Sequence, residues 1–228
     1  MNDAKIISAQ RDAYRRNFLV HGDTPKGTFQ NDRLTQYVRF THLLKEIAPH
    51  FEAGTTIHDI GSGLCDFYEY ITDEGSFPGV VYSGTEIVEE MNVAAREKFP
   101  DIALYNRNFL DAAPDEMYDF CVLSGTFNLL GSVKEDDWRE MCFDLVEKMF
   151  RQARKAISFN FLTSYRTFSD PTLCYFDPRE MMDFATTKLS RFVCVNSTVP
   201  LYEVTVTVFT KEFVQSLYPQ PELGRYFK

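Results

Sequence analysis

The sequence predicts an α/β fold built on a doubly wound, mostly parallel sheet of seven strands, preceded by a helical segment. Strand-like apolar runs alternate with helix-like patterns from about residue 55 to residue 165, which is typical of parallel strands with crossover helices. A glycine-rich turn follows the first of these runs. Residues 191–211 contain two strand-like runs with only a short link, which allows only antiparallel pairing. We therefore expect five parallel strands followed by an antiparallel hairpin.

The first 50 residues predict helices rather than strands. Residues 3–19 have a loose helical pattern, and "VHGDTPKGTFQND" is a loop rich in turn residues. "RLTQYVRFTHLLKEI" then gathers its apolar residues on one helical face. We expect residues 1–50 to form a cap or lid, residues 51–213 to form the main domain, and residues 214–228 to form a C-terminal tail.

The main domain follows in order. We expect strands at Thr55–Ile60, Val80–Thr85 and Ala103–Tyr105, in "YDFCVLSGTFN" and in "KAISFNFLTSY", and helices at Asp66–Thr72, Val88–Phe99 and Asp136–Phe150. In the final hairpin, Tyr202–Phe209 alternates polar and apolar residues along its length. No internal repeat or interdomain linker interrupts this order.

Composition and charge narrow the class of protein. With 228 residues, 44% hydrophobic and 15% aromatic, the chain has ample material for a packed core. The net charge of −9 argues against a nucleic-acid partner. There is no apolar signal core and no apolar run near the roughly 20 residues of a membrane helix. Five scattered cysteines without paired spacing, and no metal-ligand spacing, complete the prediction of a cytoplasmic, metal-free monomer or homodimer.

The glycine-rich turn in "HDIGSGLCDF" predicts a nucleotide-type cofactor and excludes some of the candidates. A P-loop needs Lys-Ser/Thr after its second glycine, whereas Gly63 is followed by Leu64. The third glycine of a dinucleotide fingerprint falls at Asp66, where an acid would oppose the diphosphate that a helix N-terminus attracts. Asp59, just before the turn, adds a second unfavourable charge.

The same acids suit S-adenosylmethionine, which carries a sulfonium, an ammonium and a carboxylate but no phosphate. Gly61, Ser62 and Gly63 let the backbone approach the amino-acid portion, and an acid at the strand end can accept from the ammonium. Glu86 ends the next strand, where a carboxylate can bind both ribose hydroxyls. Glu86 also suits NAD, so the assignment depends on the three acids together.

At these residues the sequence resembles the class I S-adenosylmethionine-dependent methyltransferases. "HDIGSGLCDF" is similar to their first motif and "GTEIVEEMNVAAREKF" to their second, and the resemblance covers roughly residues 30 to 210. It implies a Rossmann-like fold, S-adenosylmethionine as cofactor and S-adenosylhomocysteine as product. "HGDTPKGTFQNDRLTQYVRF" with "SGTFN" resembles a branch of small bacterial-type enzymes associated with surface-polysaccharide and other small-molecule pathways.

The resemblance also assigns roles residue by residue. It places Glu86 and Ile87 at the ribose, and Asn108 with Phe109 at the adenine, where the family commonly has an acid in place of Asn108. The third small residue of the first motif, usually glycine, is Cys65 here. Ser124 and Gly125 lie at the corresponding edge after the fourth strand.

The methyl acceptor is expected beyond the carboxyl ends of the strands. Methyl transfer is an in-line displacement that mainly requires orientation of the acceptor, with a general base needed only for a weak nucleophile. His21, in a polar loop, is the candidate base, although an ordinary surface histidine explains it as well. Asn128 and Tyr165 follow the fourth and fifth strands and are candidates for orienting the acceptor.

Two residues of the second N-terminal helix complete the candidate site. Gln36 and Arg39 lie about one turn apart and could reach the cofactor carboxylate or an anionic acceptor. Residues 1–50 hold eight basic and five acidic side chains, which favours a small polar, even anionic (sugar- or phosphate-type), acceptor methylated on O or N. Two alternatives stay open: a non-catalytic S-adenosylmethionine-binding subunit, and an NAD(P)-dependent reductase.

Overall fold

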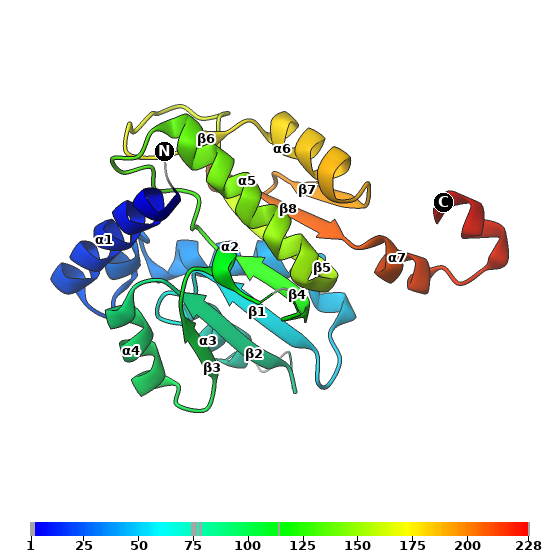
Figure 1. The fold of residues 1–228 in the computed structure, drawn as a ribbon, viewed down its shortest axis with the longest axis horizontal. Coiled ribbons are helices and arrows are strands. Elements are labelled where there is room, and N and C mark those ends of the chain that lie inside the picture. Colours follow the sequence, from blue (N-terminus) through cyan, green and yellow to red (C-terminus); the bar gives the residue numbers. More distant parts are fainter. Residues whose placement is uncertain (1–2, 74–76, 78, 114, 228) are drawn as a thin grey trace.

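The central sheet has the strand order β3-β2-β1-β4-β5-β8-β7, in a computed structural model that describes residues 3–73, 77, 79–113 and 115–227 (Figure 1). The strands are β1 Thr56–Ile60, β2 Val81–Glu86, β3 Ala103–Asn106, β4 Tyr118–Leu123, β5 Ala153–Thr163, β7 Val193–Asn196 and β8 Glu203–Phe209. The first five are parallel, whereas β8 is antiparallel to both β5 and β7. The predicted fold class is therefore confirmed.

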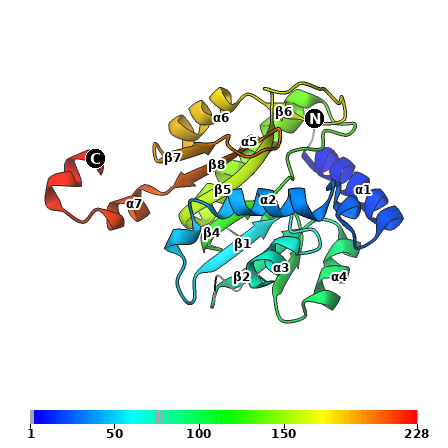
Figure 2. The ribbon, with the colours of Figure 1, turned by 180° about the vertical axis from the view of Figure 1, so that it is seen from behind.

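Helices cover both faces of the sheet, as the alternation predicts. They are α1 Asp3–His21, α2 Arg33–Leu44, α3 Asp66–Asp73, α4 Glu89–Lys98, α5 Glu135–Gln152, α6 Pro178–Phe184 and α7 Lys211–Leu217. Helices α5 and α6 lie in front of the sheet in Figure 1, and α2 and α3 lie in front of it when the molecule is turned around (Figure 2). The last turn of the chain, beyond α7, projects away from the sheet.

Each face has its own apolar core. On one face Phe40 of α2 and Phe67 of α3 pack edge to face with ring centroids 5.3 Å apart. On the other face, α5 and α6 bury Met149 and Met181 against Phe159 of β5. Burying a large apolar side chain is worth about 1.5–3 kcal/mol, so burial on both faces explains why β4 and β5 are so apolar in sequence.

A buried histidine links two neighbouring strands of the sheet next to the glycine turn. His58 of β1 is fully buried, and its two ring nitrogens hydrogen-bond Ser83 at 2.7 Å and Thr85 at 2.8 Å. Burial lowers the pKa of His58 to about 3, so the ring is neutral. His58 therefore joins β1 to β2 and is structural.

The stretch between β5 and β7 differs most from the sequence prediction. Residues 175–176 form a two-residue strand, β6, which pairs with β5, and α6 continues into a π-helical turn at Ala185–Leu189. The sequence does mark the N-terminus of α6, because Asp177 caps the helix and Pro178 occupies its first turn. The predicted fourth strand is also shorter, because the chain leaves the sheet after Leu123.

Candidate active site

The turn between β1 and α3 adopts a left-handed backbone at three positions. Gly61 has φ 72°, Gly63 has φ 54° and Cys65 has φ 63°. A Cβ added at Gly61 would lie 2.4 Å from Thr126 Oγ1, so this position requires glycine for space as well as for backbone freedom. Cys65 adopts the backbone that the usual glycine would adopt, so this departure from the motif leaves the turn unaltered at the cost of local strain.

Glu86 lies at the end of β2 and holds the glycine turn in place. Its carboxylate accepts hydrogen bonds from the backbone N–H of Gly63 at 3.0 Å and of Val88 at 2.7 Å. The side chain is buried, and burial raises its pKa above the ordinary glutamate value. The two backbone donors oppose that shift and fix the carboxylate at the pocket edge.

Asp59 and Asp66 lie on either side of the turn in different surroundings. Asp59 is buried and accepts a 2.8 Å hydrogen bond from the Tyr82 hydroxyl. Burial raises the pKa of Asp59 to about 7, and the nearby Glu86 and Asp66 carboxylates add to the shift. Asp66 is compensated, because Arg33 Nη1 and Gln36 Nε2 both donate to it at 2.7 Å.

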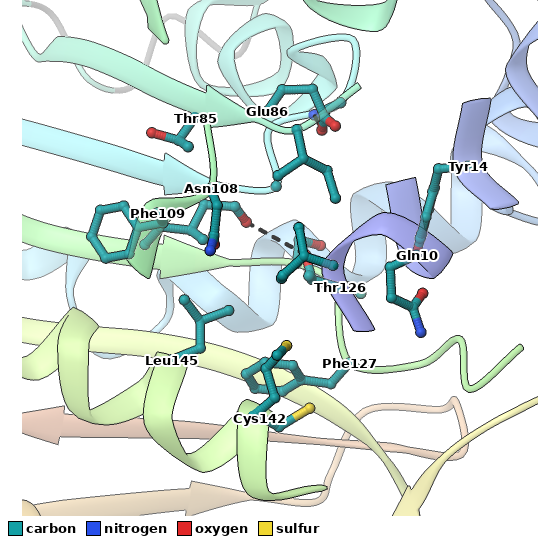
Figure 3. Close-up of a pocket in the computed structure, with 18 of the residues that line it drawn as sticks. Gln10, Tyr14, Thr85, Glu86, Asn108, Phe109, Thr126, Phe127, Cys142 and Leu145 are labelled. Carbon is teal, nitrogen blue, oxygen red and sulfur yellow. Dashed lines mark hydrogen bonds between the residues drawn. The ribbon is translucent and has the colours of Figure 1, made fainter. Parts of the chain in front are cut away.

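Two adjoining pockets open at the carboxyl ends of these strands, and Figure 3 shows the larger one. The larger encloses about 920 Å³ of space not filled by atoms, a figure that includes open solvent at its mouth. The smaller lies on the other side of the glycine turn, and Thr28, Gln30, Gly61, Gly63 and Ser124 line both. The two pockets therefore meet at the glycine turn, and together they form the cleft.

The cleft gathers twelve of the thirteen residues predicted for the cofactor. Those along the larger pocket are Glu86, Ile87, Asn108, Phe109, Ser124 and Gly125, together with Gly61 and Gly63. Those that line only the smaller pocket are Gln36, Asp59, Ser62 and Asp66. Asn108 Oδ1 also accepts from Leu110 N at 3.2 Å, which leaves its second lone pair for a ligand donor.

Arg39 is the thirteenth residue predicted for the cofactor, and it lies behind the cleft. Its guanidinium pairs with Glu203 of β8, with Nε 2.7 Å from Oε2, and Nη1 donates to Gln30. Arg39 does not line either pocket, and its guanidinium faces Glu203 and Gln30.

The three predicted catalytic residues are not brought together. His21 ends α1 on an exposed surface, and Tyr165 is 59% exposed; neither lines the cleft. Asn128 lies close to the cleft beside Gly125: a Cβ added at Gly125 would be 3.8 Å from its Nδ2. Asn128 is therefore the member of the predicted set that the fold places near the site.

Sequence reasoning missed the residues that cover the cleft. Figure 3 shows Gln10 and Tyr14 of α1 on one side, and Cys142 and Leu145 of α5 on another. The loose pattern of residues 3–19 gives no sign that Tyr14 faces the cleft; burial and the nearby Glu86 raise the pKa of its phenol, so it stays protonated. The signal for α5 was present, because apolar residues repeat there at helical spacing from Trp138 onward.

The titratable side chains that line the cleft include three acids. Asp59, Asp66 and Glu86 contribute carboxylates, whereas no lysine or arginine is among the described residues that line either pocket. The nearest compensation comes from Arg33 and Arg39. Within the described ranges, no group of three or more His, Cys, Asp or Glu side chains could hold a metal ion.

The strand order, the glycine turn and the acid at the end of β2 define a class I S-adenosylmethionine-dependent methyltransferase, and the chain belongs to this family. It is 30% identical over 156 residues to the Mycobacterium tuberculosis protein named "Putative methyltransferase Rv1506c", a match that covers 67% of this chain and 92% of that protein. No family model matches the chain. Family membership excludes the NAD(P)-dependent reductase.

Solved structures share the fold at low sequence identity. Magnesium protoporphyrin IX methyltransferase of Synechocystis PCC 6803, solved with S-adenosylmethionine, gives a TM-score of 0.60 at 11% identity, over 88% of this chain and 97% of that one. The 1,6-didemethyltoxoflavin-N1-methyltransferase of Burkholderia thailandensis gives 0.61 at 9% identity, over 91% and 89%. In the described part of the chain no helix combines the length and the apolar character needed to span a membrane.

Proposed function

We propose that this protein transfers the methyl group of S-adenosylmethionine to an O or N atom of a small acceptor. The observation that carries the proposal is the junction of Glu86 with the glycine turn, where one buried carboxylate accepts from Gly63 N–H and lies on the pocket edge. Such a carboxylate can accept from the ribose hydroxyls, and Asn108 and Phe109, which line the same pocket, would contact the adenine.

The cofactor's amino-acid portion would occupy the smaller pocket. An ammonium beside Asp59 and Asp66 would gain from their charge and would favour the ionised form of Asp59. The bound cofactor supplies an activated methyl group, and the protein's task is to orient the acceptor and exclude water. We propose that residues 1–50 act as the cap over the cleft, with 51–213 as the methyltransferase domain and 214–228 as a tail.

The lining of the cleft bears on the acceptor. Trp138, Met141 and Phe127 supply an apolar wall, and Asn128 lies near its edge. The hypothesis of an anionic acceptor is supported only by exposed cations in residues 1–50, namely Arg15, Arg16 and Lys26. Assays of methyl transfer to a panel of neutral and anionic hydroxyl and amine compounds would distinguish a neutral from an anionic acceptor. If the acceptor is anionic, replacing these three cations by neutral residues should raise its KM.

Calorimetric titration with S-adenosylmethionine, S-adenosylhomocysteine and NAD(P)H tests the proposal directly. We expect the first two to bind at micromolar Kd and the Glu86→Ala variant to lose this binding, while Glu97→Ala, an exposed acid on α4, retains it. Thermal unfolding of both variants checks that they are folded. Binding without turnover on any acceptor, restored by a partner protein, would favour the non-catalytic subunit instead.

A further inference from the structure

A buried polar network runs behind the cleft and ends at Gln30. Glu203 accepts from Arg39 Nε at 2.7 Å and from Asn160 Nδ2 at 2.5 Å. Asn160 Oδ1 in turn accepts from Gly125 N at 2.8 Å. Arg39 donates through Nη1 to Gln30 Oε1. Glu203, Arg39 and Asn160 are all at least nine-tenths buried, so the network is shielded from water.

This network determines which way the Gln30 amide points. A guanidinium can only donate, so the Gln30 oxygen must face Arg39 and its Nε2 must face the opposite way. A Cβ added at Gly125 would lie 3.2 Å from Gln30 Nε2, which places that nitrogen beside the turn after β4. Gln30 lines both pockets, so its N–H donor lies where the two pockets meet.

The backbone N–H donors of the glycine turn, which lines the smaller pocket, already have acceptors. The N–H groups of Gly61 and Ser62 donate to Thr85 O, and that of Gly63 donates to Glu86. The other side-chain amide of this pocket, Gln36, donates to Asp66. Gln30 Nε2 has no acceptor among the described residues, and a ligand oxygen would complete its hydrogen bonding.

Phe29, the residue before Gln30, has a strained backbone conformation. Phe29 has φ 57°, in the left-handed region that a bulky side chain rarely adopts, and its amide N–H donates to Lys26 O at 3.0 Å. Its ring packs edge to face on Tyr14 of α1, with centroids 5.1 Å apart. Strain of this kind persists only where the surroundings enforce it, and it occurs here next to a residue of the cleft.

We propose that Gln30 Nε2 binds the carboxylate of the cofactor's amino-acid portion and that Arg39 and Glu203 act through it as positioning residues. The proposal rests on the proposed function, because it needs S-adenosylmethionine in the cleft. In the smaller pocket, Asp59 and Asp66 supply carboxylates for the ammonium of the cofactor. Gln30, which lines the same pocket, supplies a neutral donor for the carboxylate of the cofactor. Arg39 therefore contributes to binding without contacting the ligand.

Two substitutions at Gln30 separate a ligand contact from a merely structural role. Gln30→Glu keeps an oxygen for Arg39 but removes the N–H donor, and Gln30→Met removes both without adding charge. Each variant is titrated with S-adenosylhomocysteine and with 5′-methylthioadenosine, which keeps the adenosine and sulfur but lacks the carboxylate and ammonium. Gln215→Glu, on the exposed side of α7, is the matched control.

We expect both Gln30 variants to bind S-adenosylhomocysteine about 10-fold or more weakly, as for loss of a hydrogen bond to a charged group, with 5′-methylthioadenosine binding changed by less than about 2-fold. If Gln30→Glu binds S-adenosylhomocysteine like the unaltered protein, Gln30 only braces Arg39 and the proposal is overturned. Equal weakening of both ligands would show a general disturbance of the loop and would overturn it as well. An unaltered protein that binds neither ligand would instead refute the proposed function.

Discussion

Replacing Asp59 by asparagine should stabilise the protein most above neutral pH. Asp59 is buried next to two other carboxylates, and its pKa is raised from 3.8 to about 7. An asparagine side chain at this position would still accept the Tyr82 hydrogen bond through its amide oxygen, because the two side chains have the same shape. The substitution therefore removes a charge that folding must bury while retaining its one side-chain partner.

The sign follows from the protons bound in the two states. Between pH 3.8 and about 7 the folded protein retains the Asp59 proton that the unfolded chain has lost, so stability falls as pH rises through this window. With these two pKa values the loss is about 2 kcal/mol at about pH 5.5 and about 4 kcal/mol at about pH 8. The advantage of Asp59→Asn over the unaltered protein should thus grow by about 2 kcal/mol between the two conditions.

Urea unfolding of both proteins at these two pH values measures the difference, and all other titrating groups cancel to first order. A stability difference that does not change with pH would refute the raised pKa, and a difference that shrinks toward pH 8 would mean that Asp59 is ionised and stabilised in the folded state. If the cofactor ammonium lies beside Asp59, the more stable variant should also bind S-adenosylhomocysteine more weakly at about pH 8.

Three further substitutions test other parts of the structure. Glu203→Gln leaves the Arg39 guanidinium buried without its counter-charge and should cost about 3–5 kcal/mol in urea unfolding; an unchanged midpoint would contradict the buried pair. Gly61→Ala places a Cβ 2.4 Å from Thr126 Oγ1, so calorimetry should detect at least about a 10-fold loss of S-adenosylhomocysteine affinity, whereas normal binding would mean that the turn can shift. Asp32→Ala removes the cap of α2 and should lower the midpoint of thermal unfolding, with Asp32→Asn as the tolerated control.

The sequence predicted the features that depend on neighbours in the chain. The glycine turn and Glu86 were found because a strand end, a left-handed turn and a helix start leave a local pattern, and parallel strands bring their ends to one edge. Alternation and link length likewise predicted the parallel strands with their crossover helices and the final antiparallel hairpin.

What the sequence did not reveal depends on pairs distant in the chain. Arg39 was expected at the ligand because its partner Glu203, 164 residues away, could not be recognised. Gln30 carries no motif, and its importance follows only from the orientation that Arg39 imposes on its amide. His21 and Tyr165 had the right chemistry, but both side chains are exposed and neither lines the cleft.

The Arg39–Glu203 pair also bears on the order in which parts of the protein fold. Glu203 opens β8, near the end of the chain, and β8 inserts between β5 and β7. A nascent chain still lacking residue 203 would have an uncompensated guanidinium beneath its ligand cleft, an arrangement that a low-dielectric interior disfavours strongly. The network behind the cleft is therefore completed only after β8 has joined the sheet between β5 and β7.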